Sequence, residues 1–189
     1  MITFRPIEKE DLGILKEWRN SEEVMPYVRE YRYLNNTDQE KWYEGYLASR
    51  RKADFDQEIF IVQAEGPDIE EDQRSVFIKG REAMIEPIMT NVPIGVGGFT
   101  RIEWKNRKAE LTFYLGKQDY ENVRKAAIEK ILEKGFKEFG FHKIYWPVYS
   151  HDPNLSAYNN IFDEKIILKE EYWYNGWQDR IYLSKINTS

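Results

Sequence analysis

The stretch PIGVGGFTRIEWKNRKAELTFYLG, residues 93–116, decides the fold that the sequence predicts. Its two halves, residues 93–104 and 108–116, are rich in β-branched and aromatic side chains, and the tripeptide Lys-Asn-Arg separates them. This composition predicts two strands joined by a hairpin. The three glycines of the first strand lack the spacing of a dinucleotide-binding motif, so they indicate strand bulges or close packing.

Helical and strand-like segments alternate on the C-terminal side of this hairpin. The spacing of apolar residues predicts the longest helix over 120–139, and a strand follows over 142–150. A shorter helix is predicted over 154–165. Asn175-Gly176 then separates two strand-like runs. Because both residues accept the positive φ of a type I′ turn, we predict a terminal hairpin.

The N-terminal side carries the remaining predicted elements. They are a strand over 2–7, helices over 8–20 and 37–51, and a strand over 58–65. The second helix should begin at Thr37, because Glu40 three residues later completes a capping-box pattern. The region from 66 to 92 is a variable insertion, either an extended hairpin or an irregular loop. The order of elements predicts an α/β (α+β) layer structure in a single domain over 1–189.

Composition excludes several classes of function. The 189 residues carry a net charge of −5, which argues against a general binder of nucleic acid or of anionic membranes. With no cysteine and two histidines, thiolate or histidine-rich metal sites are excluded, and we predict no metal. The N-terminus lacks a signal-peptide core and no apolar run approaches membrane-spanning length, so we expect a cytoplasmic protein.

Four segments in this order resemble the GNAT superfamily of acyl-CoA-dependent N-acetyltransferases. They are residues 2–20, 93–116, 135–154 and 174–186. The similarity is to the branch that acts on ribosomal-protein N-termini, polyamines and amino sugars. It implies a mixed central sheet of about seven strands, flanked by helices, in which the fourth and fifth strands splay apart.

The resemblance also implies an activity. The expected reaction transfers acetyl from acetyl-CoA, as co-substrate, to a primary amine on a protein N-terminus, an amino sugar or a small molecule. The amine would attack the thioester directly, without a covalent enzyme intermediate. The alternative is a non-catalytic GNAT-fold binding or scaffold protein whose loop for the CoA pyrophosphate is degenerate.

In this family the pantetheine arm of CoA binds along the fourth strand, which implies main-chain contacts at Phe113, Tyr114 and Leu115. Pro147 in the fifth strand fits this picture, because proline cannot donate a hydrogen bond to a neighbouring strand. An ordinary edge strand would explain Pro147 as well. The family pattern further implies a CoA contact at Asn154, which opens the helix after the fifth strand.

The pyrophosphate turn departs from the glycine-rich family pattern. Two interpretations are open for residues 116–127. Asp119 could act as the N-cap of a helix, in which case the segment is structural. Alternatively, the side chains of Arg124 and Lys125 replace the usual backbone amides and hold the pyrophosphate. Asn122 and Val123 occupy positions of the family turn, and the resemblance implies that they also contact CoA.

The resemblance implies two catalytic residues. Glu110 matches the strand glutamate that serves as general base, directly or through a water. Its alternative role is a solvated strand acid or a structural salt bridge. Tyr158 is the best candidate for protonating the leaving thiolate, although its spacing differs from the family pattern, and a packing role is the alternative.

The acceptor amine should bind between the first helices. Arginines and tyrosines mix there in a pattern that could hold a nucleotide-sugar phosphate or an acidic peptide. The candidate residues are Arg19, Arg29, Arg32 and Tyr33. A surface loop or a dimer contact is the alternative. Aromatic residues near the C-terminus also favour a homodimer.

Overall fold

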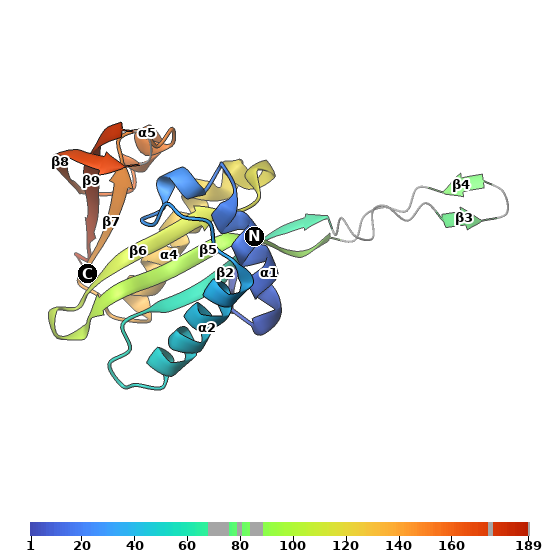
Figure 1. Cartoon of the computed structure of the whole chain (residues 1–189), viewed down its shortest axis with the longest axis horizontal. Helices are drawn as coiled ribbons and strands as arrows, with labels where there is room; N and C mark the ends of the chain where they lie inside the picture. Colours follow the sequence, from blue (N-terminus) through green and yellow to red (C-terminus); the bar gives the residue numbers. More distant parts are fainter. Residues whose placement is uncertain (68–75, 79–80, 84–88, 174–175, 189) are drawn as a thin grey trace.

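The computed structural model of the chain describes residues 1–67, 76–78, 81–83, 89–173 and 176–188. A seven-stranded mixed sheet, ordered β1-β2-β5-β6-β7-β9-β8, forms its centre (Figure 1). The strands are β1 (Ile2–Pro6), β2 (Glu58–Pro67), β5 (Met89–Glu103), β6 (Lys108–Leu115), β7 (Lys143–Tyr149), β8 (Glu164–Trp173) and β9 (Gly176–Ile186). The predicted mixed sheet of about seven strands is therefore confirmed.

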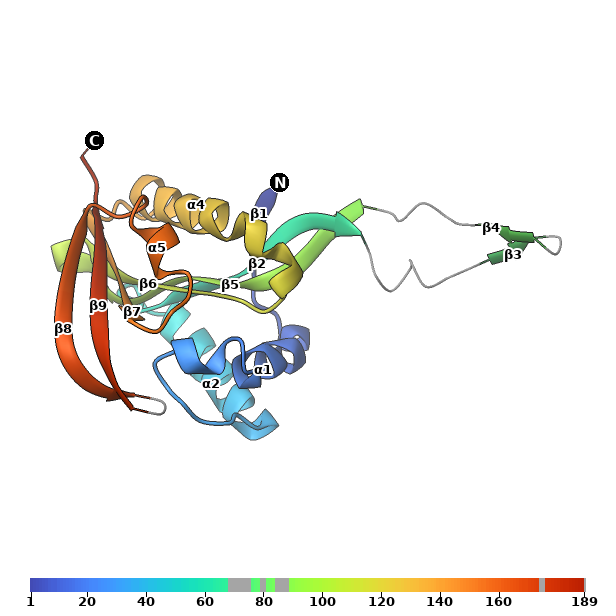
Figure 2. The same cartoon turned by 90° about the horizontal axis from the view of Figure 1, so that it is seen from above.

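Helices cover both faces of the sheet. The α-helices are α1 (Leu12–Asn20), α2 (Asn36–Arg50), α4 (Arg124–Lys137) and α5 (Leu155–Tyr158). Four 3₁₀ helices are described, η1 (Lys9–Asp11), η2 (Met25–Tyr27), η3 (Trp104–Asn106) and η4 (Gln118–Val123). Figure 2 shows α4 and α5 on one face of the sheet and α1 and α2 on the other.

Each helical layer buries an apolar stripe against the sheet. On one face Ile128 and Ile131 of α4 join a buried cluster with Phe99 of β5. On the other face Trp18 of α1 and Tyr46 of α2 belong to a second cluster. Burial of a large apolar side chain contributes roughly 1.5–3 kcal/mol. These two stripes therefore fix the helices to the sheet.

The sheet divides between β6 and β7. These strands are parallel and pair over three residues only, Lys108–Glu110 with Lys143–Tyr145. Beyond Glu110, β6 has no partner on β7 within the described residues, while β7 continues to pair with β9 through Tyr149. The predicted splay between these two strands is confirmed, and it opens the space in which the site lies.

Several predicted boundaries are corrected. Asn35, not Thr37, caps α2: its side chain accepts a hydrogen bond from the Asp38 amide at 3.0 Å, and the Asn35 amide donates to the Asp38 carboxylate at 3.0 Å. The helix predicted over 120–139 begins as an α-helix only at Arg124. The helix predicted over 154–165 is a single turn, because β8 already begins at Glu164.

The insertion and the terminal hairpin lie partly outside the described residues. In the insertion, β2 and β5 extend as a ladder to Pro67 and Met89, and β3 (Val76–Ile78) pairs with β4 (Arg81–Ala83) in a second, two-stranded sheet. Residues 68–75, 79–80 and 84–88 lie outside the description. β8 and β9 pair antiparallel as predicted, whereas turn residues 174–175 are not described. Among the described helices, none is long and apolar enough to cross a membrane.

A bidentate ion pair ties β1 to the start of the first helix. Arg5 Nη1 and Nη2 each donate to an Asp11 carboxylate oxygen at 2.7 Å, and the Glu8 amide donates to Asp11 at 2.8 Å. Burial raises the pKa of Asp11, but these hydrogen bonds outweigh it and leave the pKa below its usual value. The pair therefore stabilises the folded state above the unfolded pKa of about 3.9 and is lost as pH falls through the folded pKa.

We expect Asp11→Asn to lower the free energy of unfolding by about 1–2 kcal/mol at pH 7, because charge-assisted hydrogen bonds are lost. The difference from the parent chain should shrink as pH falls below about 4. Urea unfolding at several pH values measures both effects. Exposed Asp54→Asn is the control, and an equal loss at all pH values would contradict the assignment.

Candidate active site

Two adjoining cavities lie where β6 and β7 diverge. The larger has a volume of about 330 Å³ and extends under the loop between α1 and α2, and the smaller, of about 210 Å³, extends toward α5. Both are lined by Phe113 and Tyr114 of β6 and by Trp146 of β7. The two cavities therefore meet at the splay and share these wall residues.

Glu110 lines the larger cavity at the last paired residue of β6. Only 4% of its side chain is exposed, and two arginines share its carboxylate. Arg29 ion-pairs with Oε1, and Arg101 Nη1 lies 3.4 Å from Oε2. The geometry is compatible with both roles considered for Glu110, general base and salt-bridge partner, because its carboxylate lies at the cavity wall and also pairs with arginines. Proton acceptance from a bound amine requires that one oxygen remain accessible, directly or through a water.

Arg101 reaches the cavity from a strained segment of β5. Its φ is 48°, a left-handed conformation that is uncommon for arginine, and the β5–β6 register shifts between Thr100 and Glu103. Such strain costs on the order of 1 kcal/mol and is often found at functional sites. Sequence reasoning missed Arg101. The available signal was an arginine two residues after Phe99, where strand alternation predicts an inward-facing apolar side chain.

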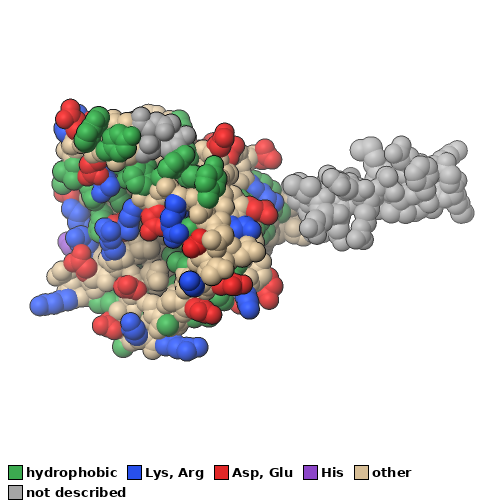
Figure 3. Space-filling view, viewed as in Figure 1, with side chains coloured by type: hydrophobic (Ala, Val, Ile, Leu, Met, Phe, Trp, Pro, Cys, Tyr) green, Lys and Arg blue, Asp and Glu red, His purple; other side chains and the backbone are tan. Residues whose placement is uncertain are grey.

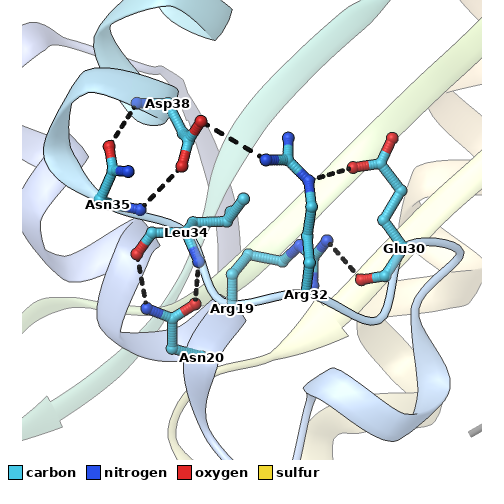
Figure 4. A network of polar contacts seen from close by, with 7 residues as sticks. All are labelled: Arg19, Asn20, Glu30, Arg32, Leu34, Asn35 and Asp38. Atoms are coloured by element: carbon cyan, nitrogen blue, oxygen red, sulfur yellow. Dashed lines mark hydrogen bonds and ion pairs between the residues drawn. The ribbon is translucent and has the colours of Figure 1, made fainter.

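A polar network fixes the loop between α1 and α2 (Figure 4). Arg32 ion-pairs with Glu30 (Nε–Oε2 3.1 Å) and with Asp38 (Nη1–Oδ1 3.4 Å). The Asn20 side chain at the end of α1 holds the main chain of Leu34 with two hydrogen bonds of 2.8 Å. The loop is therefore fastened to both helices that flank it.

The structure brings together three of the four predicted acceptor residues. Arg19, Arg29 and Arg32 all line the larger cavity, whereas Tyr33 is 74% exposed and is not among its lining residues. Burial lowers the pKa of Arg19, and its Nη1 atom is buried without a hydrogen-bond partner in the described part of the chain. Arg180 of β9 also lines this cavity and was not predicted.

The same loop is anchored to the C-terminal hairpin. The Pro26 carbonyl accepts a hydrogen bond from Trp173 Nε1 at 3.1 Å and lies 3.1 Å from His151 Nε2. Tyr149 stacks on Trp173, with ring centroids 5.0 Å apart. These contacts hold the loop that carries Arg29 over the larger cavity.

Tyr158 and Asp152 form the polar wall of the smaller cavity. The Tyr158 hydroxyl donates to Asp152 Oδ2 at 3.3 Å, and the Asn154 amide donates to Asp152 Oδ1 at 2.8 Å. Burial and then the Asp152 carboxylate raise the pKa of Tyr158, so its hydroxyl stays protonated at neutral pH. Asp152 was not predicted from the sequence. The tripeptide Asp-Pro-Asn could have indicated it, because an aspartate in such a turn accepts a hydrogen bond from the main-chain amide two residues later.

The predicted CoA residues divide into two groups. Those that line the smaller cavity are Phe113, Tyr114, Leu115, Arg124 and Asn154. Asn122, Val123 and Lys125 line neither cavity; Lys125 Nζ lies 3.8 Å from Glu129 instead. Arg124 points inward, with its guanidinium 5.8 Å from the Phe113 ring centroid, and ion-pairs with Glu121.

The structure contradicts the interpretation of Asp119 as the N-cap of the long helix. Asp119 is not an N-cap, since it lies within η4, and Val123 occupies the N-cap of α4 without a side-chain hydrogen bond. The Arg124 amide already donates to the Glu121 carbonyl, because η4 runs directly into α4. The helix dipole still favours an anion at this end of α4. For metals, the described residues contain no group of three or more His, Cys, Asp or Glu side chains that could hold an ion.

Comparison with known proteins identifies the family and the fold of the chain. The family model described as the acetyltransferase (GNAT) domain matches residues 1–157. Spermidine N-acetyltransferase from Vibrio cholerae in complex with CoA and spermine is 21% identical, with a TM-score of 0.70 over 97% of this chain and 95% of that chain. The dodecameric form of that enzyme in an intermediate state is 21% identical, with a TM-score of 0.69 over 98% and 93%. These identities show a shared fold. No curated protein matches the sequence.

Proposed function

Since the chain belongs to the GNAT acetyltransferase family, we propose that it transfers an acetyl group from acetyl-CoA to a primary amine by direct attack. The observation that carries this proposal is the meeting of two cavities at the splay of β6 and β7. One contains a carboxylate, Glu110, and the other contains a protonated hydroxyl, Tyr158. These are the groups that an amine nucleophile and a thiolate leaving group need.

In the proposed reaction the amine lies in the larger cavity and the pantetheine arm in the smaller one. At Phe113–Leu115 the main chain of β6 pairs with β5 but not with β7, so on that side it could bind the arm as it would bind an added strand. The amine nitrogen forms a bond to the thioester carbon, and the carbon–sulfur bond breaks. Glu110 accepts the proton that the nitrogen loses, directly or through a water, and Tyr158 donates a proton to the departing thiolate.

The diphosphate of CoA is assigned to the start of α4. The helix dipole favours an anion there. Arg124 adds positive charge at the edge of the smaller cavity. Lys125 is not assigned a contact with the diphosphate, because its side chain lies against Glu129.

A non-catalytic binding or scaffold role is the second candidate. It is favoured by the pyrophosphate turn, where Asn122 and Val123 line neither cavity and Arg124 already has Glu121 as partner. Acetyl-CoA binding separates the candidates. At a hundredfold excess over Kd, acetyl-CoA should stabilise the fold by about 2.7 kcal/mol, which a thermal melt registers. Absence of a shift at millimolar acetyl-CoA would favour the scaffold role.

Turnover is measurable without background from the protein, because the chain contains no cysteine and a thiol reagent therefore reports only released CoA. We expect Tyr158→Phe to lower kcat about 10²-fold, because the leaving thiolate loses its proton donor. Acetyl-CoA affinity should change little. Tyr43→Phe, in the second apolar cluster, is the matched control. Unchanged kcat in Tyr158→Phe would assign that side chain to packing against Trp146, whose ring centroid lies 4.7 Å away.

A homodimer and a cytoplasmic location complete the proposal. β8 is the last strand of the sheet and exposes the consecutive apolar residues Ile166, Ile167 and Leu168. Figure 3 shows hydrophobic side chains gathered at the end of the molecule where β8 and β9 lie. A second copy covering this edge would remove apolar area from water. Sedimentation of the parent chain and of Ile167→Lys tests the dimer, and cell fractionation tests the location.

A further inference from the structure

We infer that the acceptor is a small amine that also carries an oxyanion, either a carboxylate or a phosphate, and that the larger cavity rejects polyamines. This inference rests on the proposed function, since it names the substrate class for the same site. The whole chain has a net charge of −5, yet the lining of this cavity has an excess of positive charge.

Arginines dominate the charged lining. The five that line the cavity are Arg19, Arg29, Arg32, Arg101 and Arg180. Against them stand three acidic side chains, Glu30, Asp38 and Glu110, within the described lining. Arg32 takes up two of these acids, as its ion pairs show. The described lining as a whole therefore has five positive and three negative charges.

Three of these arginines converge from different elements and form what we call the arginine cluster: Arg29, Arg101 and Arg180. Arg29 follows η2, Arg101 lies at the β5 irregularity and Arg180 belongs to β9. Arg29 and Arg101 share the carboxylate of Glu110, while Arg180 bonds Glu171 at 2.6 Å outside the lining. Each guanidinium carries five N–H donors in a planar fork, so donors remain for a second oxyanion.

The cluster holds like charges close together. Burial, and then the neighbouring charge of Arg101 and that of Arg180, lower the pKa of Arg29. Arg101 is also held in this place by a left-handed backbone at φ 48°. Glu110 and Glu171 offset part of this repulsion, and a bound oxyanion would offset the remainder.

The same charges discriminate among amines. An amine near the arginine cluster loses its proton more readily, because neighbouring positive charge disfavours the ammonium form. A single amine can therefore bind uncharged and attack, while Glu110 takes the proton. A polyamine brings further ammonium groups, and each meets an excess of guanidinium charge. The volume of about 330 Å³ suits a small molecule.

Paired probes that differ in one anionic group test the inference. Glucosamine 6-phosphate against glucosamine gives the phosphate arm, leucine against leucinamide gives the carboxylate arm, and spermidine is the polycation. Calorimetric Kd and, with acetyl-CoA, kcat/KM from released thiol are measured for each. We expect the member of at least one pair that carries the anionic group to be favoured about tenfold or more over the partner that lacks it, with spermidine weakest.

Arg101→Gln should reduce that preference to about threefold or less while affinity for the partner that lacks the anionic group is kept. Arg107→Gln is the matched control, because Arg107 has nearly the same backbone angle, φ 49°, and is not among the lining residues. Spermidine as the best acceptor, or no preference for either anion by calorimetry, would overturn the inference. A preference in binding without turnover for any probe would support the inference and count against the proposed acetyl transfer.

Discussion

Glu110→Gln is expected to lower kcat about 10³-fold, within the range of general-base catalysis. Glutamine keeps the length and shape of the side chain, and its single amide oxygen can still accept a hydrogen bond from Arg29 or Arg101, but it cannot accept a proton from the amine. The loss should therefore appear in kcat at saturating substrate. Affinity for acetyl-CoA should remain unchanged, because Glu110 lines only the cavity that is assigned to the acceptor.

The control for this variant is Glu103→Gln. Glu103 lies at the end of β5, pairs with Lys108 and lines neither cavity. Both variants are assayed by release of CoA thiol and by the thermal shift with acetyl-CoA. If Glu110→Gln keeps full turnover, Glu110 serves only as the counterion of Arg29 and Arg101. If it melts well below the parent chain, its kinetic loss is not evidence for base catalysis.

The largest effect on stability is expected for Gly98→Ala, which should lower the free energy of unfolding by about 3 kcal/mol. Gly98 has a φ of 148°, a conformation that side chains rarely adopt, and a Cβ there would lie 2.1 Å from the Glu58 carbonyl oxygen of β2. The clash is with main chain, so no side-chain rotation relieves it. β2 and β5 would have to separate at the centre of the sheet.

Gly45→Ala is the matched control, with the opposite sign. Gly45 is exposed within α2, and nothing lies within 4 Å of the position that its Cβ would occupy. Alanine there should stabilise the chain by about 0.5–1 kcal/mol, because it favours the helix. Differential scanning calorimetry measures both variants. A loss below about 1 kcal/mol for Gly98→Ala would mean that the two strands are less closely packed than described.

The fold was predictable because local patterns and long-range pairing agree over most of the chain. The hairpin of residues 93–116 became β5 and β6, and the predicted close packing of its glycines holds at Gly98. The predicted boundaries of helices were wrong where two signals in the chain compete. Thr37 and Asn35 both begin capping boxes, and the structure uses the earlier one. Residues after Ile161 continue a helical pattern, yet pairing with β9 draws them into a strand.

The candidate site was less predictable, since contacts between distant segments create it. The resemblance pointed to Glu110 and Tyr158, but it did not reveal that Arg29 and Arg101 would meet at one carboxylate. No spacing rule links Arg180 to either of them. Tyr158 falls beside the smaller cavity although its spacing is unusual, because the short α5 turns it toward Trp146.

The three-residue pairing between β6 and β7 leaves the sheet as two half-sheets joined by a narrow seam. One half comprises β1, β2, β5 and β6, and the other β7, β9 and β8. An extended ligand bound in the gap beyond Glu110 would contact both half-sheets at once. In the proposed function this ligand is acetyl-CoA. Bound acetyl-CoA would then bridge the two half-sheets as well as react. When CoA leaves after each turnover, that bridge would be lost, and the gap through which the next molecule enters would open more easily.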